Sequence, residues 1–202
     1  MAIAEREIAP QTQRRRYTED EYLALEDAAQ YKSEYVDGEI RPMSGGTDYH
    51  GALAINTGAE LRAALRGRGC LVMSSDVKVR AAGQMYYPDV SVTCGPRQYF
   101  SGNRTVITNP LLVAEVLSPS TEGKDRGEKF HSYLAVESLV VYLLVSQDAP
   151  RIEQFSRAED GQWNYTFTSG LDSILDIPAL SISLNFADVY DQIEFTQGAN
   201  DE

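Results

Sequence analysis

Two acidic side chains stand where a carboxylate is unusual. Asp89 follows Pro88 in the run YYPDVSV, and Glu115 interrupts the apolar run LLVAEVL. A carboxylate within an apolar strand is costly unless it has a partner, and ionisable groups in such places often belong to functional sites. Each acid alone also has a structural interpretation. Glu115 would then be a strand-end acid in a salt bridge, and Asp89 a surface acid beside a turn-forming proline.

The two acids together indicate a metal site. If their strands adjoin, Asp89 and Glu115 project from neighbouring strand ends onto the same face of a sheet. Two anions so close repel each other unless a cation lies between them. Oxygen ligands with room for water are typical of Mg²⁺ or Mn²⁺, which activate water and bind a scissile phosphate. The pair therefore predicts metal-dependent phosphodiester hydrolysis.

Cysteine and histidine argue against zinc. The chain has only Cys70, Cys94, His50 and His131, and no two of them are spaced as zinc ligands. The cysteines lie in separate strand-like segments without a CxxC pair, which indicates two buried thiols in a reducing cytoplasm. His50 precedes an amphipathic helix and could contact a phosphate, although a structural role is the alternative.

The strands that carry the acids are predicted from apolar patterning. Residues 70–80 and 85–94 alternate around an AAGQ turn and indicate one long antiparallel hairpin. Residues 111–117 form a near-continuous apolar run, as in a central strand covered on both faces. A helix from 118 to about 137 and a buried strand at 139–146 complete a parallel crossover.

The flanking segments give weaker signals. Thr18 and Glu21 have capping-box spacing, which predicts a helix from about 19 to 29. Asp37-Gly38 predicts a tight hairpin turn that places Glu34 on a strand. A second helix is expected from 49 to 65, and an antiparallel meander with a short closing helix at the C-terminus.

Size and charge limit the possibilities. The chain has 202 residues, which suits one domain at 17–195 between disordered segments at 1–16 and 196–202. No apolar run reaches the roughly 20 residues of a membrane span, and no secretory signal is evident, so a cytoplasmic protein is expected. The net charge of −12 opposes unspecific DNA binding, unless the clustered basic residues form a local basic face. Those residues are Arg62, Arg66, Arg68, Lys78 and Arg80, and further along Lys124, Arg126 and Lys129.

The order of these motifs is similar to a known family. YYPDVSV, a loop, LLVAEVLSPST, and then Asp125, Lys129 and Tyr133 at four-residue intervals resemble the Uma-type restriction endonucleases, a branch of the PD-(D/E)XK superfamily. The resemblance extends from YTEDEYLAL and SEYVDGEI to LVVYLLVS. It implies an α/β restriction-endonuclease-like core, which is a mixed β-sheet flanked by helices. It also implies that Asp89, Glu115 and the backbone carbonyl of Val116 hold Mg²⁺.

One position departs from the superfamily pattern. The usual catalytic lysine lies two residues after the second acid, and here that residue is Leu117. Lys129 is the predicted replacement, because on a helix it shares a face with Asp125 and Tyr133. The alternative is a solvated lysine paired with Asp125. Other candidates are Lys124 and Lys78.

Glu34 resembles the acid that many such nucleases add from an N-terminal element to hold a second metal or a metal-bound water. The alternative is a cross-strand partner for Arg41. The resulting prediction is a Mg²⁺- or Mn²⁺-dependent endonuclease acting on DNA, with Asp89, Glu115, Lys129 and Glu34 in its site and a homodimer for double-strand cutting. Two other functions stay open: a catalytically inactive nuclease-fold binding module, and a regulatory protein-interaction partner.

Overall fold

The computed structural model describes residues 15–195, and the chain divides into two compact units between Met43 and Ser44. Except for Arg15 and Arg16, the segments predicted to be disordered, 1–16 and 196–202, lie outside the described residues. One domain spanning 17–195 stays a prediction.

The first unit contains one helix and one hairpin, as the sequence predicts. Helix α1 (Glu19–Ala28) begins with the expected capping box, in which the Thr18 hydroxyl accepts from the Glu21 N–H and the Glu21 carboxylate accepts from the Thr18 N–H. Strands β1 (Ser33–Val36) and β2 (Glu39–Pro42) pair antiparallel. Asp37 and Gly38 have φ angles of 50° and 79°, the left-handed conformation that a tight hairpin turn requires.

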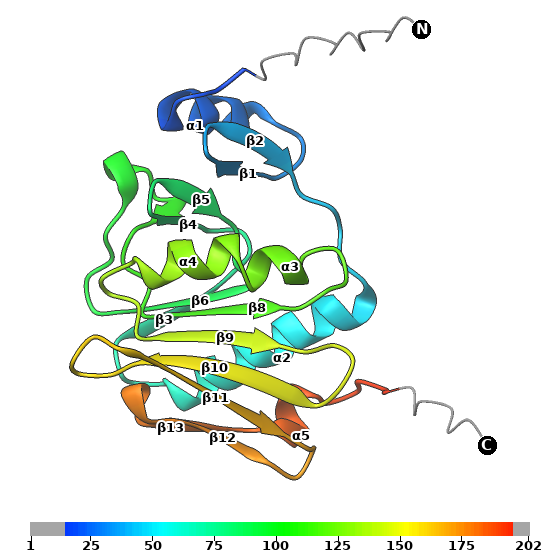
Figure 1. Cartoon of the computed structure of the whole chain (residues 1–202). Coiled ribbons are helices and arrows are strands. Elements are labelled where there is room, and N and C mark those ends of the chain that lie inside the picture. The colour runs from blue at the N-terminus through cyan, green and yellow to red at the C-terminus, as the bar shows by residue number, and fades with distance from the viewer. Residues whose placement is uncertain (1–14, 196–202) are drawn as a thin grey trace, which may run out of the picture. The chain divides into compact units, whose positions relative to one another are not determined.

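The second unit is built on a six-stranded mixed sheet in the order β11-β10-β9-β8-β6-β3 (Figure 1). Its strands are β3 (Cys70–Ser74), β6 (Val90–Cys94), β8 (Leu112–Val116), β9 (Val141–Val145), β10 (Arg151–Arg157) and β11 (Trp163–Ser169). Within this sheet only the neighbours β8 and β9 run parallel. The chain between them holds α3 (Glu122–Asp125) and α4 (Glu128–Leu134). The strand, helix, strand order predicted from the sequence is therefore confirmed.

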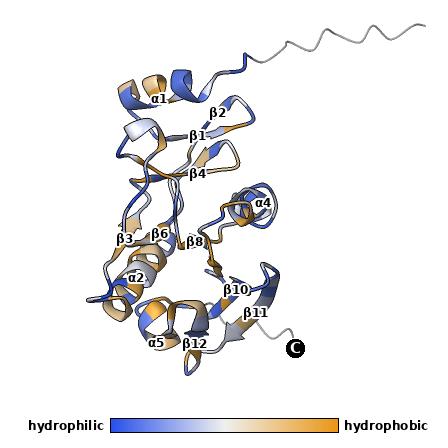
Figure 2. Ribbon diagram, turned by 90° about the vertical axis from the view of Figure 1, so that its left-hand side faces the viewer, coloured by the Kyte–Doolittle hydropathy of each residue, from blue (hydrophilic) through white to orange (hydrophobic). Residues whose placement is uncertain are grey.

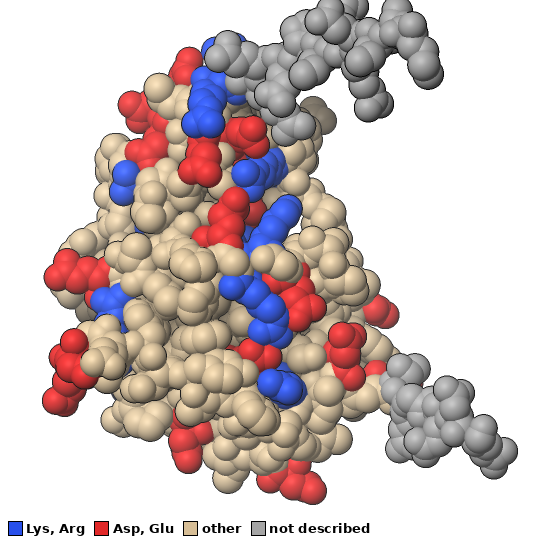
Figure 3. All heavy atoms as spheres, in the orientation of Figure 1, with Lys and Arg blue, Asp and Glu red and all other residues tan. Residues whose placement is uncertain are grey.

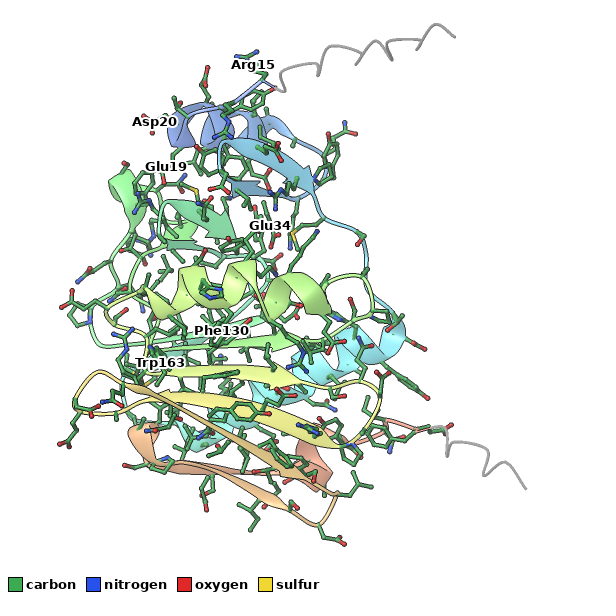
Figure 4. All side chains as sticks on the ribbon, viewed as in Figure 1. Arg15, Glu19, Asp20, Glu34, Phe130 and Trp163 are labelled. Atoms are coloured by element: carbon green, nitrogen blue, oxygen red, sulfur yellow. A yellow bond between two sulfur atoms is a disulfide. The ribbon has the colours of Figure 1, made fainter. Side chains whose placement is uncertain are left out.

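The two faces of this sheet are covered differently. Leu112, Ala114 and Val116 point into a core that also contains side chains of α2 (Asp48–Ala64), of α5 (Phe186–Val189) and of the hairpin β12–β13 (Ile174–Ile177 and Ile182–Asn185). The opposite face is covered by α4 (Figures 1 and 2). There Phe130, labelled in Figure 4, packs with its ring centroid 4.6 Å from that of Phe155 on β10. Glu115 lies on this second face, because side chains alternate along β8.

The predicted long hairpin over residues 70–94 is wrong, because it divides into two shorter ones. Its outer parts, β3 and β6, pair in the large sheet, whereas β4 (Lys78–Ala81) and β5 (Gln84–Tyr86) form a separate hairpin. β4 also pairs in parallel with β7 (Val106–Ile107), a short strand in the segment expected to be a loop. Pro88 lies in one of the breaks and lacks the N–H that a ladder needs. Asp89 consequently stands just before β6, where the large sheet begins.

The predicted single helix from 118 to about 137 is also interrupted. It begins only at Glu122 and is broken into α3 and α4 at Gly127, which has φ −115° and ψ −93°. A Cβ atom at Gly127 would lie 3.0 Å from the Gly123 carbonyl oxygen, so this close approach of the backbone suits glycine. In the part of the chain that is described, no helix is long and apolar enough to cross a membrane.

The prediction of two buried thiols is wrong. Cys70 on β3 lies directly opposite Cys94 on β6, and the two are joined as a disulfide between half-buried residues. Strand alternation places both side chains on one face, which separate sequence segments could not reveal. The cysteines therefore give no support to a reducing compartment.

We expect the disulfide to contribute measurably to stability. Replacing Cys70 and Cys94 together with serine should lower the free energy of unfolding by roughly 2–4 kcal/mol, because the unfolded chain is no longer closed into a loop. Urea unfolding of the oxidised wild type and the double variant measures the difference. Reduced wild type is the matched control and should unfold like the variant. Equal stability of oxidised and reduced wild type would contradict the prediction.

Candidate functional site

Asp89 and Glu115 lie side by side where β6 begins and β8 ends. Val90 pairs with Ala114, so the next residues outward in the register are Asp89 and Glu115. The Asp89 carboxylate accepts a hydrogen bond of 2.7 Å through Oδ2 from the backbone N–H of Val116. In an extended strand the N–H and C=O of one residue point to the same side, so the Val116 carbonyl faces the side on which Asp89 lies. The geometry thus brings together the three predicted metal ligands of this unit.

Lys129 reaches the strand acid from α4. Its Nζ lies 3.2 Å from Glu115 Oε1 and 3.2 Å from Asp125 Oδ1, and the Lys129 side chain is only 7% exposed. The Tyr133 hydroxyl donates to the same Glu115 oxygen at 3.1 Å. The helix face predicted from the four-residue spacing therefore points at Glu115. The alternative interpretation is right that Lys129 pairs with Asp125 but wrong that the lysine is solvated, and the catalytic role of Lys129 stays a prediction.

His50 contacts the other acid. Its Nε2 lies 3.0 Å from Asp89 Oδ1, and both side chains are mostly buried. The Thr47 hydroxyl accepts from the His50 N–H and so fixes the first turn of α2. The hydrogen bond with Asp89 raises the pKa of His50 above its ordinary value, against the opposing effect of burial. The sequence shows His50 near a helix start but gives no sign of this partner.

Carboxyl groups outnumber basic groups in the ion-pair contacts around Asp89 and Glu115. The carboxyl groups of Asp89, Glu115 and Asp125 face one lysine, Lys129, and one histidine, His50. The field of the acids also reaches Tyr142, whose pKa is raised well above its ordinary value by burial and secondly by the charge of Glu115. Such a cluster favours an additional cation.

The donor set fits a magnesium-type ion. Two carboxylates and a main-chain carbonyl are oxygen ligands, and Mg²⁺ usually takes one or two protein carboxylates and keeps several waters. Among residues 15–195, no group of three or more His, Cys, Asp or Glu side chains is placed to hold a metal. The predicted set of Asp89, Glu115 and the Val116 carbonyl has only two such side chains.

The remaining candidates lie elsewhere or contribute differently. Leu117, at the usual lysine position, is 7% exposed and packs as an apolar residue. Lys78 is buried and donates to the Tyr87 hydroxyl at 2.9 Å, whereas Lys124 is exposed. Glu34 lies opposite Arg41 in the first unit, as its structural interpretation requires, and its part in the metal site stays a prediction.

A second acid lies on the same sheet face. Glu115 is in register with Leu144, and Leu144 with Glu153, so the two glutamates are two strands apart. Arg126 donates to both Glu153 oxygens, at 2.7 and 2.9 Å, and to Glu122 at 2.7 Å. Glu122, Arg126 and Glu153 line a cleft of about 410 Å³ together with Arg151 and Tyr165.

Lys124, Arg126 and Lys129 do not form the single basic face expected from the sequence. Lys129 is buried between Glu115 and Asp125, and Arg126 is shared by two glutamates. In the view of Figure 3, acidic and basic side chains are mixed over this side of the molecule. Acids close in the sequence and acids from strands of the sheet therefore pair with two of the three clustered cations.

Glu153 should make stability depend on pH. The hydrogen bonds from Arg126 hold its pKa below the ordinary value, so its contribution is present above about pH 4.3, the unfolded pKa, and is lost as the pH falls through the folded pKa. Glu153→Gln should lower the free energy of unfolding at pH 7 by about 2–3 kcal/mol, with a smaller difference in acid. Urea unfolding across pH measures both effects. The exposed Glu159→Gln is the control, and a pH-independent difference would contradict the assignment.

Comparison with known proteins identifies both the sequence family and the fold. Residues 19–187 match the family described as "Uma2: Putative restriction endonuclease". Two relatives come from Synechocystis sp. (strain ATCC 27184). "Uncharacterized protein slr1290" is 39% identical over 173 residues, covering 83% of this chain and 87% of the relative. "Uncharacterized protein sll1609" is 32% identical over 167 residues, covering 82% and 94%.

A solved structure shares the fold. It is described as the crystal structure of "a putative nuclease belonging to DUF820" from Anabaena variabilis ATCC 29413. It superposes with a TM-score of 0.70 at 19% identity, covering 88% of this chain and 99% of that chain. The predicted restriction-endonuclease-like α/β fold, with its mixed sheet between helices and C-terminal antiparallel strands, is confirmed.

Proposed function

Because this chain belongs to the Uma2 family of restriction-endonuclease-like proteins, we propose that it is a divalent-metal-dependent endonuclease that hydrolyses phosphodiester bonds in DNA. The observation that carries the proposal is the position of Lys129. Its ammonium group lies 3.2 Å from Glu115. In the superfamily pattern, the lysine that accompanies this acid lies two residues after it in the sequence. A lysine supplied by a helix replaces the one missing at Leu117.

The proposed roles follow from the contacts. Asp89, Glu115 and the Val116 carbonyl would hold Mg²⁺ or Mn²⁺, which supplies charge neutralisation on a phosphate oxygen and a more acidic water. Lys129 donates hydrogen bonds to the attacking water or to the phosphate, where negative charge develops. Tyr133 and Asp125 fix Lys129 and Glu115 in place, and His50 orients Asp89. Water then adds to phosphorus as the bond to the leaving oxygen breaks.

Supercoiled plasmid tests the proposal. The purified chain should nick or linearise it with Mg²⁺ or Mn²⁺ and leave it intact with a chelator. Glu115→Gln should be inactive in the same assay, whereas Glu122→Gln, a partly exposed acid of α3, should cut like wild type. Cleavage in the chelator, or equal cleavage by Glu115→Gln, would refute the metal site. DNA binding without cleavage would favour the inactive binding module.

A further inference from the structure

The outer edge of the large sheet is exposed and uncharged. Strand β11 is the last strand of the order β11-β10-β9-β8-β6-β3, and no other strand in residues 15–195 pairs with its outer side. Its seven residues, WNYTFTS, contain no charged residue and no proline. Natural sheets usually protect such edges with lysine, proline or a bulge, because an open strand readily pairs with another chain. β11 has none of these protections.

The ladder with β10 shows which backbone groups face outward. The Ala158 N–H donates to the Gln162 carbonyl and the Gly170 N–H to the Pro150 carbonyl, both at 2.8 Å. These two bonds flank the seven residue pairs of β10 and β11 and show which of those pairs are hydrogen-bonded. In an antiparallel pair the hydrogen-bonded positions alternate. The even-numbered residues of β11 therefore bond to β10. The N–H and C=O groups of Trp163, Tyr165, Phe167 and Ser169 point to the open edge.

The side chains on this edge are aromatic. Tyr165 is 49% exposed and Phe167 is 54% exposed, both on the α4 face of the sheet. Leu171 and Ile174, which follow β11, are 46% and 56% exposed. Half of the exposed large hydrophobic side chains of the described residues thus lie within 165–174. Concentrated apolar surface is a common feature of interaction sites.

Nucleic acid fits this surface less well than protein. Exposed aromatic rings beside arginines can stack with unpaired bases, but only if the cations remain available for phosphate. Here Arg151 lies 3.6 Å from Glu153, which also binds Arg126. The Arg157 guanidinium donates to the main-chain carbonyl oxygens of Leu134, Val136 and Glu137, at the C-terminal end of α4 and just after it, instead of remaining available for phosphate.

We propose that β11 pairs antiparallel with β11 of a second copy of this chain, around a two-fold axis at Thr166. This register uses all seven residues and places Tyr165 opposite Phe167 of the other copy, twice, with Trp163 opposite Ser169. All four outward-facing residues then both donate and accept backbone hydrogen bonds. Aromatic cross-strand pairs stabilise such a ladder, and no like charges meet across it. The strand is therefore complementary to itself.

The two-fold axis gives a sharp test. Thr166 is exposed and would lie directly opposite its own copy, so Thr166→Lys places two ammonium groups side by side. Full-length wild type should have twice the 22.4 kDa chain mass in light scattering, and the variant the chain mass alone. Thr166→Asp should behave like Thr166→Lys. An equal mixture of the two variants should recover the doubled mass as a heterodimer.

The controls separate pairing from folding. Ser183→Lys, an exposed position on β13, should keep the doubled mass, and all variants should keep the wild-type circular dichroism and melting temperature. Wild type at the chain mass, or Thr166→Lys at twice the chain mass, overturns the proposal. A mixture that fails to associate overturns the register. Monomeric wild type that binds a single-stranded oligonucleotide, and loses it in Phe167→Ala, would instead assign the surface to nucleic acid. None of these results depends on nuclease activity.

Discussion

Lys129→Met is expected to lower the rate of Mg²⁺-dependent DNA cleavage by about 100- to 1,000-fold, the usual effect of losing one donor to developing charge. The wild-type ammonium group lies at Glu115, where the scissile phosphate would bind. Methionine keeps the length of the side chain but cannot donate a hydrogen bond or neutralise charge. Single-turnover cleavage of a plasmid at saturating Mg²⁺ measures the rate.

Three results distinguish catalysis by Lys129 from a purely structural role. Lys124→Met, an exposed lysine of α3, is the matched control and should cut at the wild-type rate. Lys129→Met should still bind Mn²⁺ in calorimetry, and more tightly than wild type, since it removes a positive charge beside the carboxylates. If Lys129→Met cuts as fast as Lys124→Met, the relocated lysine is not part of the mechanism.

Asp89→Asn should have the other large effect, on metal binding as well as on cleavage. Asparagine removes the negative charge and replaces one of the two oxygens that contact the Val116 N–H and His50. We expect Mn²⁺ affinity to fall by at least about tenfold, the size seen even for residues behind the metal ligands. Cleavage at low metal concentration should be lost. Calorimetry with Mn²⁺ and plasmid nicking at graded Mg²⁺ measure both effects.

The exposed Asp172→Asn is the control for Asp89→Asn and should bind and cut normally. Partial recovery of Asp89→Asn at high Mg²⁺ would agree with weakened binding. Unchanged Mn²⁺ affinity would mean that Asp89 serves only to hold Val116 and His50. The site would then need a different set of metal ligands.

Short-range patterns in the sequence predicted most of what surrounds Glu115. The shared helix face of Lys129 and Tyr133 is predictable because i, i+4 spacing on a helix is local and survives the break at Gly127. Asp89 and Glu115 lie opposite each other at the ends of neighbouring strands, as two strand-like runs of suitable pattern predict. The capping box at Thr18 and the turn at Asp37-Gly38 are likewise local signals, and both are confirmed.

The errors concern contacts between distant segments. The hairpin over residues 70–94 looked continuous because alternation alone does not show that its inner part leaves the large sheet. The Cys70–Cys94 disulfide depends on the register of β3 with β6. Arg126 looked like part of a basic face until β10 brought Glu153 to it. Such pairings are decided by tertiary packing, which leaves no local trace in the sequence.

Four residues of the cluster come from one short piece of chain. Glu115, Asp125, Lys129 and Tyr133 all lie in the β8-to-α4 segment, within residues 112–134, whereas Asp89 and His50 come from other parts of the chain. One continuous crossover segment therefore supplies the acid, the lysine that lies beside it and the tyrosine that donates to it, so the relative position of these three groups depends on a single stretch of chain.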